Sequence, residues 1–179
     1  MFTAPGRSVE TRHPRVALVV RPAGPEDKEH IQALVRGLSP RSRYLRFFNG
    51  VRELSPQWLE RFARAVPDSG LTLLALVPDR DRLIPVGMAQ YATDPYPVRG
   101  EFAVVVDDAW QGMGIGRQLI DNLIHIARDA GIERIDGEVL VENQPMLRLM
   151  HGMGFEVRRD PESALYLRVS IALAETTIH

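Results

Sequence analysis

Residues 111–117 read Gln-Gly-Met-Gly-Ile-Gly-Arg and lie between two patterned segments. The apolar run 102–106 is typical of a strand, and residues 115–130 have the apolar periodicity of a helix. Glycine has no Cβ, so backbone N–H groups in such a turn can approach a ligand closely. The first helical turn adds unpaired N–H groups and the positive end of the helix dipole. The segment therefore predicts a site for a phosphate or diphosphate group.

Two other glycine-rich phosphate loops do not fit this segment. A P-loop ends in Gly-Lys followed by Ser or Thr, whereas Gly116 is followed by Arg117 and Gln118. The dinucleotide fingerprint requires G-x-G-x-x-G, whereas here the third glycine comes one residue early and the loop lies late in the chain. A flexible turn without a ligand is the remaining alternative.

Glu101 is the candidate for acid–base chemistry. It lies near the start of the strand expected at residues 98–106, and strand alternation places it on one face with Ala103 and Val105. Apolar neighbours disfavour a charged carboxylate and make it a stronger proton acceptor. We therefore expect Glu101 to act as a general base. The alternative is a glutamate on an edge strand that points into solvent.

Length and composition restrict the class of protein. The chain has 179 residues, 45% hydrophobic and 25% charged, which suits one globular domain with a substantial core. A net charge of −1 provides no general basic field for nucleic acid or an anionic membrane. The absence of cysteine excludes disulfides and thiolate metal sites, and the five histidines are scattered, so no metal is expected. No signal-peptide or membrane-length apolar run occurs, which predicts a cytoplasmic protein.

Several elements must position these groups. Proline follows Ser39 and Ser55 directly, as at the start of a helix with a serine N-cap, and a helix is also expected after Pro25. We expect residues 1–14 to form a flexible leader and residues 15–179 to form one α/β domain. The expected strands are 16–20, 71–77, 83–91, 98–106, 132–141, 155–159 and 165–170, and the later helices are 40–48, 56–66, 115–130 and 143–153.

The motif Gln-x-x-Gly-x-Gly after a strand is similar to the coenzyme A pyrophosphate loop of the GNAT acyltransferase superfamily. The similarity extends from about Arg15 to Ser170 and includes residues 101–111, residues 139–147 and the pair Gly154-Phe155. Residues 39–48 resemble more narrowly the GNAT domains of bacterial protein lysine acetyltransferases. The resemblance implies an α+β domain with a mostly antiparallel sheet of about six to seven strands. This sheet is splayed between its fourth and fifth strands, and helices cover both faces.

The resemblance also implies an activity, the transfer of acetyl from acetyl-CoA to a primary amine, with a protein lysine as the expected acceptor. A small amine such as a polyamine or amino sugar, or a non-catalytic acyl-CoA-binding sensor, is the alternative. Glu101 is implied as the general base, and Tyr44 and Phe48 are expected to line the acceptor site. A homodimer through an exposed edge strand is possible in such a sheet. The residues implied to bind coenzyme A are Val104, Val105, Val106, Gln111, Gly112, Met113, Gly114, Ile115, Gly116, Arg117 and Asn143.

Several of these residues have simpler alternatives. The three valines can fill a core, Arg117 can be a solvated surface residue, and Asn143 can be a helix N-cap. The arginines and aromatic residues of 41–48 could suggest a nucleic-acid patch. The net charge and the helical spacing of the apolar residues favour a packed helix with a basic rim instead.

One position departs from the pattern of the superfamily. Many members carry a tyrosine seven residues after the asparagine, as general acid for the leaving sulfur, whereas this chain has Met150 there. The adjacent His151 points about 100° away on a helix, so we do not assign it that role. A thiol with a pKa near ~8.5 leaves adequately without help, so activity does not require the tyrosine. The lysine acetyltransferase branch also commonly lacks it.

Overall fold

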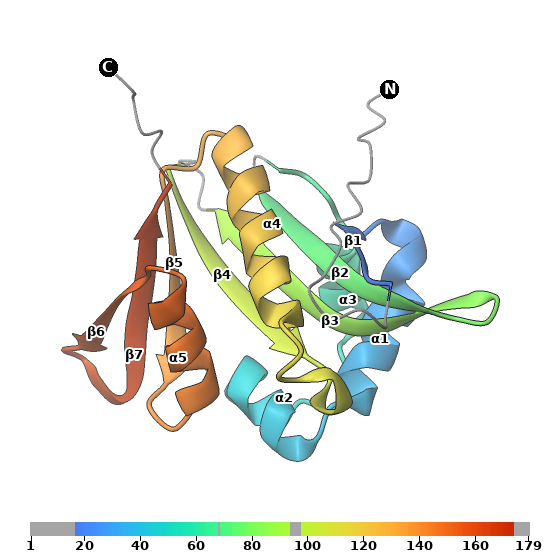
Figure 1. The fold of residues 1–179 in the computed structure, drawn as a ribbon, viewed down its shortest axis with the longest axis horizontal. Coiled ribbons are helices and arrows are strands. Elements are labelled where there is room, and N and C mark those ends of the chain that lie inside the picture. Colours follow the sequence, from blue (N-terminus) through green and yellow to red (C-terminus); the bar gives the residue numbers. More distant parts are fainter. Residues whose placement is uncertain (1–16, 68, 94–97, 174–179) are drawn as a thin grey trace.

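The computed structural model describes residues 17–67, 69–93 and 98–173, so the leader expected at residues 1–14 lies outside the described part. Seven strands form one sheet in the order β1-β2-β3-β4-β5-β7-β6 (Figure 1). The strands are β1 (Val19–Pro22), β2 (Gly70–Asp79), β3 (Arg82–Thr93), β4 (Arg99–Val106), β5 (Arg134–Leu140), β6 (Glu156–Asp160) and β7 (Ser163–Ala172). The helices are α1 (Lys28–Gly37), α2 (Pro40–Phe47), α3 (Pro56–Phe62), α4 (Ile115–Asp129) and α5 (Gln144–Gly152), with 3-10 turns at Pro25–Asp27 and Asp108–Trp110. The β4–β5 pair is parallel and the other strand pairs are antiparallel.

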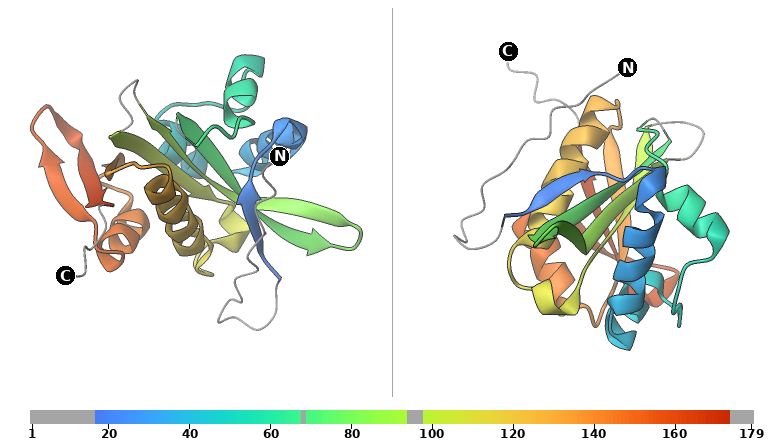
Figure 2. Two further views of the ribbon diagram at one scale, coloured as in Figure 1. Left: turned by 90° about the horizontal axis from the view of Figure 1, so that it is seen from above. Right: turned by 90° about the vertical axis from the view of Figure 1, so that its right-hand side faces the viewer.

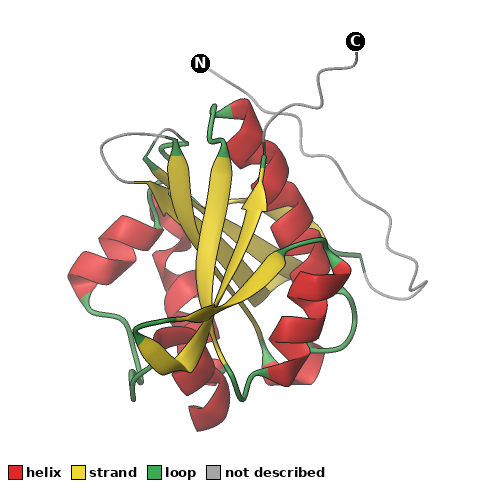
Figure 3. Cartoon of the chain, turned by 90° about the vertical axis from the view of Figure 1, so that its left-hand side faces the viewer, coloured by secondary structure: helices red, strands yellow, loops and turns green. Residues whose placement is uncertain are grey.

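Helices cover both faces of the sheet, as the family resemblance implies (Figures 2 and 3). Helix α4 packs on one face of β2, β3 and β4, and α1 packs on the opposite face of β3. The neighbouring residues Leu73 and Leu74 on β2 are both buried but belong to the two different core clusters. A strand that is covered on both faces needs a continuous apolar run, which explains why β2 has no polar alternation.

The helix starts agree with the sequence signals. The Ser39 and Ser55 hydroxyls accept hydrogen bonds from the N–H groups of residues 42 and 58, at 3.1 and 3.3 Å. The first strand differs from the expected range 16–20, because β1 runs from Val19 to Pro22 and so has a proline as its last residue. Because β1 is an edge strand with β2 as its one neighbour in the sheet, proline can be accommodated there. Helix α3 also ends at Phe62, four residues before the expected end.

The sheet opens between β4 and β5, which confirms the predicted splay. In the described residues their pairing is limited to Arg99–Glu101 on β4, opposite residues 134–136 on β5. Beyond Glu101 the two strands diverge toward α2 (Figure 1). Gly137 lies at the point of separation, where a Cβ would be 2.8 Å from Cε1 of Phe102. The Phe102 ring also packs on Phe155, with centroids 5.3 Å apart, so an aromatic side chain occupies the apex of the opening.

None of the helices in the described part of the chain combines the length and apolar character needed to cross a bilayer.

Candidate functional site

The separation of β4 and β5 creates a cavity of about 220 Å³. It brings together Glu101, Val104, Asn143 and Phe48, four of the residues selected from the sequence. Tyr44 does not line this cavity and is instead 40% exposed on α2. The full lining is Leu45, Arg46, Phe47, Phe48, Trp58, Glu101, Phe102, Ala103, Val104, Gly137, Glu138, Val139, Asn143 and Met146.

Beyond Glu101, every second residue of β4 points its backbone N–H and C=O groups into this opening. The carbonyl of Val105 lies against Gly87 on β3, whereas the carbonyl of Phe102 lies against Gly137 on β5. Because successive peptide groups point in opposite directions along a strand, those of Val104 and Val106 are on the β5 side. The Val106 carbonyl accepts a hydrogen bond from the Gln111 side chain at 3.0 Å. Within the described part of the chain, the Val104 N–H and C=O therefore face the cavity without a partner strand on that side.

The glycine-rich loop leaves the end of β4 and leads into α4. Gly112 and Gly114 have φ values of 77° and 81°, in the region that favours glycine, so these two positions require it. The first backbone bond of α4 is donated by the Gln118 N–H to the Gly114 carbonyl, at 3.1 Å. No side chain caps the helix among the described residues, so the N–H groups of residues 115–117 precede the first intrahelical bond. This is the arrangement that the sequence predicts for a phosphate site.

A hydrogen-bond network joins this loop to α2, and the sequence analysis did not identify it. The Asp108 carboxylate accepts bonds from the Ser39 N–H, the Ser39 hydroxyl and the Ser42 hydroxyl, at 2.9, 2.8 and 2.7 Å. Gln111 donates to the same Ser42 hydroxyl at 3.3 Å. Burial would raise the pKa of Asp108, but the hydrogen bonds from Ser39 and Ser42 together lower it. The network fixes the N-terminus of α2 against the loop.

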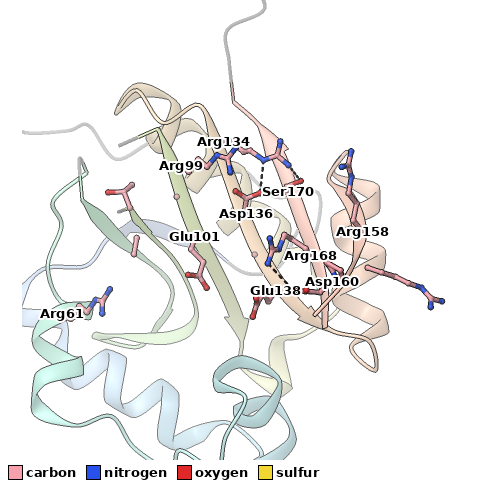
Figure 4. A pocket seen from close by; sticks show the side chains of 16 residues that line it. Arg61, Arg99, Glu101, Arg134, Asp136, Glu138, Arg158, Asp160, Arg168 and Ser170 are labelled. Carbon is pink, nitrogen blue, oxygen red and sulfur yellow. Dashed lines mark hydrogen bonds and ion pairs between the residues drawn. The ribbon is translucent and has the colours of Figure 1, made fainter. Parts of the chain in front are cut away.

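Glu101 lies where three cavities meet. Its strand face includes Ala103 and Val105 as expected, but its own side chain is exposed, so the apolar enclosure that we expected is absent. The side chain instead borders open cavities that are lined in part by charged groups. On its outer side Glu101 borders an open hollow of about 680 Å³ whose walls include Arg99, Arg134 and Glu138 (Figure 4).

The hollow is rich in charged side chains from β5, β6 and β7 (Figure 4). Arg134 donates to Asp136 at 3.0 Å and to the Ser170 hydroxyl at 2.6 Å, and Arg168 contacts Asp160 at 3.2 Å. These pairs link side chains within β5 and between β5, β7 and β6. Because basic and acidic groups alternate on the wall, the hollow suits a polar or charged molecule rather than an apolar one.

Arg46 is a further cavity residue that the sequence analysis placed only in the basic rim of a helix. Its Nη2 donates to Oε1 of Gln90, and its guanidinium lies 4.7 Å from the centroid of the Phe47 ring. Its Nε atom is buried and has no hydrogen-bond partner among the described residues. Burial lowers the pKa of Arg46 to about 10, and nearby Glu101 opposes this change. Basic residues at helical spacing do not show which of them is buried, so this role was not visible in the sequence.

The remaining selected residues have defined contacts. The Asn143 side chain accepts from the Met146 N–H at 3.3 Å, so it caps α5 while it also lines the cavity. Arg117 donates to the Gly152 carbonyl at 3.0 Å and so links α4 to the end of α5. Met150 is fully buried in the core, and its neighbour His151 is exposed. Phe48 has a φ of 58° and packs on Tyr166 of β7, with centroids 5.1 Å apart.

Comparison with known proteins gives concordant matches. The model of the acetyltransferase (GNAT) family matches residues 39–155. Acetyltransferase PA5475 of Pseudomonas aeruginosa is 30% identical over 156 residues, which cover 87% of this chain and 84% of that protein. Mycothiol acetyltransferase of Thermobifida fusca is 40% identical over 65 residues, which are 36% of this chain and 20% of that protein.

Two solved structures have the same fold. The GNAT domain of S. lividans PAT superposes with a TM-score of 0.78 at 24% identity, covering 87% of this chain and 90% of that one. The yncA protein of Salmonella typhimurium, whose structure includes its cofactor acetyl-CoA, gives a TM-score of 0.69 at 20% identity, covering 90% and 97%.

Proposed function

The chain belongs to the GNAT acetyltransferase family, and from this premise we propose that it is an acetyl-CoA-dependent N-acetyltransferase with Glu101 as its general base. The observation that carries the proposal is the open edge of β4, which begins at Glu101 and leads directly into the loop before α4. A carboxylate and a set of unpaired N–H groups thus lie at the two ends of one strand edge. The presence of acetyl-CoA in the related yncA structure supports this donor.

The residues of the loop and cleft fit the parts of coenzyme A. The N–H groups of residues 115–117 and the αL turns at Gly112 and Gly114 suit a diphosphate, since they combine unpaired donors with the helix dipole. The Val104 peptide groups suit an extended amide chain, which would pair with β4 as an added strand does. Acetyl-CoA supplies the acetyl group and a thiolate leaving group. This chain contributes alignment and proton removal.

The proposed reaction is direct attack by an amine. Glu101 accepts a proton from the acceptor ammonium, directly or through a water, because an ammonium has no lone pair for attack. The amine nitrogen then bonds to the acetyl carbon, the C–S bond breaks, the thiolate leaves, and the second nitrogen proton passes to solvent. A backbone N–H of residues 104–106 would stabilise the oxygen of the tetrahedral intermediate. The buried Met150 cannot donate a proton, so the thiolate takes its proton from solvent.

We propose a protein lysine as the acceptor. The hollow of about 680 Å³ beside Glu101 is open and has charged walls, which suits the long side chain of a lysine presented by a macromolecule. A small primary amine would undergo the same chemistry at the same carboxylate. The two acceptor types can be separated by activity against lysine-containing proteins and a panel of free amines.

Two measurements test the proposed function. Acetyl-CoA at a hundredfold excess over its Kd should stabilise the fold by about 2.7 kcal/mol, seen as a rise in melting temperature. Thiol release in the presence of an amine should fall by about 10²–10⁴-fold in Glu101→Gln. Glu133→Gln is the matched control, because Glu133 is exposed and does not line the cavities around Glu101. A protein that neither binds acetyl-CoA nor releases thiol would refute the proposal, and binding with no turnover would indicate a sensor.

A further inference from the structure

The guanidinium of Arg46 holds the one buried side-chain nitrogen or oxygen atom that has no hydrogen-bond partner in the described part of the chain. Of its N–H groups only those of Nη2 have a partner there, the Gln90 side chain, and its Nε is buried without one. Glu101 is near enough to influence Arg46 electrostatically, but the two side chains do not form an ion pair. A buried cation with free donors costs free energy unless an anion or acceptor compensates it. Such a group in a cleft is therefore a candidate for ligand binding.

A second cavity, of about 400 Å³, lies between α3 and the sheet and is lined by both Arg46 and Glu101. Arg61 of α3 and Arg64, two residues after the end of that helix, also line it. Neither forms an ion pair with another described residue, although Arg64 is near enough to Glu60 to interact with it electrostatically. Glu101 is the one carboxylate among the lining residues of this cavity in the described chain. Three arginines with a single carboxylate give the cavity a positive potential that attracts anions.

Aromatic and apolar side chains form much of the pocket wall beside the charged groups, together with the polar Ser69, Thr72 and Gln90. Trp58 and Phe62 of α3 and Tyr91 of β3 line it, and the two α3 rings pack edge to face with centroids 5.4 Å apart. Low-polarity walls strengthen a charge-assisted hydrogen bond, because water competes less for the partners. The cavity thus contains the positively charged Arg46 guanidinium, and the Glu101 carboxylate, the proposed base for the acceptor amine, lies at its edge.

We propose that the acceptor is an amine that also carries a carboxylate, which binds the Arg46 guanidinium while the amine lies at Glu101. This inference rests on the proposed function and narrows its substrate class. A planar guanidinium suits a carboxylate because two parallel N–H groups can bind its two oxygens. Arg61 and Arg64 assist by attracting the anion at the rim. The carboxylate can belong to a free amino acid or to an acidic residue beside a lysine in a peptide.

Matched acceptors separate these sources in the full chain. One arm compares L-phenylalanine with phenethylamine and L-methionine with 3-(methylthio)propylamine, pairs that differ only in the carboxylate. The other arm compares peptides containing Asp-Lys with the same peptides containing Asn-Lys. We expect kcat/KM for thiol release to favour the carboxylate-bearing member of at least one arm by about 10- to 100-fold, the worth of a hydrogen bond to a charged group. The arm that shows the preference identifies the source.

Substitution of Arg46 tests the residue. Arg46→Met should abolish the preference, so that the two members of each pair have equal kcat/KM, and Arg46→Lys should restore part of it. Arg82→Met is the control for net charge, because Arg82 is exposed at the start of β3 and does not line the cavities around Glu101, so this variant should keep the full preference. Removing a buried charge without a full set of partners should not lower the melting temperature. If Arg46→Met fails to fold, the partial preference of Arg46→Lys still tests the inference.

Calorimetry on the coenzyme A complex provides a readout that does not depend on turnover. The carboxylate-bearing compounds should bind more tightly than their partners to the wild type, and equally to Arg46→Met. Equal kcat/KM and equal binding in the wild type, including no binding by either member, would overturn the inference. A preference that survives in Arg46→Met would overturn it as well. Failure of the proposed function is a separate result, namely no melting shift with acetyl-CoA and no thiol from any acceptor.

Discussion

Replacing Gly137 with alanine should close part of the space between β4 and β5 and destabilise the fold. The added Cβ would lie 2.8 and 3.1 Å from two carbons of the Phe102 ring and 3.2 Å from the Phe102 carbonyl oxygen. Ordinary carbon–carbon contacts are about 3.5–4.0 Å, so either the ring or the strand must move. The ring cannot retreat freely because it packs on Phe155.

The size of the effect follows from two opposing contributions. Overpacking of a core of this kind costs about 1–3 kcal/mol. Alanine also lowers the conformational entropy of the unfolded chain, which stabilises the folded state by about 0.4–1 kcal/mol. The expected net loss is about 1–2 kcal/mol, which for a chain of this length lowers the melting temperature by roughly 2–8 °C. Melting of Gly137→Ala against the wild type, with and without acetyl-CoA, measures it.

Gly100→Ala is a stringent control, because it adds the same atom one strand away. A Cβ on Gly100 would be 3.6 Å from its nearest neighbours, an ordinary contact, so its melting temperature should be unchanged or slightly higher. In the pair Gly137→Ala with Phe102→Leu, a smaller side chain relieves the clash, so the double variant should lose less stability than the sum of the single ones. Equal melting of Gly137→Ala and Gly100→Ala would refute the steric reasoning.

Three further predictions concern the loop, the first turn and α2. Gly114 has a φ of 81°, and a Cβ added there would meet no other atom, so the cost of Gly114→Ala comes from backbone strain alone. The variant should lose about 1–2 kcal/mol of folding stability and bind acetyl-CoA more weakly. An unchanged Kd and melting curve would contradict this. Asp27 is 1% exposed and accepts two bonds from Arg21, so Asp27→Asn should lose about 2–4 kcal/mol in denaturant titrations, less than for a fully buried pair. The Arg21 guanidinium holds the pKa of Asp27 well below its usual range, so its stabilisation is present above about pH 4 and is lost as the pH falls toward the folded-state value; Asp27→Asn should not show that loss. Asp108→Ala removes the acceptor for Ser42 and should cost about 1–3 kcal/mol and speed amide hydrogen exchange in α2; unchanged exchange would argue against the network.

The order and type of the elements could be predicted because their signals are local. Serine followed by proline starts α2 and α3, and glycine with a positive φ of 78° at Gly131 follows α4. The convergence of Glu101, Asn143 and Phe48 on one cavity follows from the resemblance to a known sheet topology. Local patterns and the topology of the resembling family therefore account for the main strands, helices and cleft.

The properties of the site that depend on distant segments could not be predicted in this way. Arg46 is buried because α2 lies against Gln90 of β3, a contact between residues 44 positions apart that periodicity does not encode. Gly137 is required because the Phe102 ring points at it from another strand, whereas the sequence alone shows an ordinary strand glycine. Glu101 has the expected apolar neighbours along its strand, but its exposure depends on distant segments that line the cavities around it, which the strand pattern does not show.

The divergence of β4 and β5 has a consequence for how the protein avoids self-association. An unpaired strand border usually lies at the periphery, where a strand from another molecule can attach and start an aggregate. Here the unpaired border is internal and is flanked by α2 on one side and α5 on the other. A slender linear molecule can enter this slot, whereas a second sheet cannot approach it. The unpaired backbone groups of β4 are thus accessible to a small extended ligand and shielded from a strand of another copy of the chain.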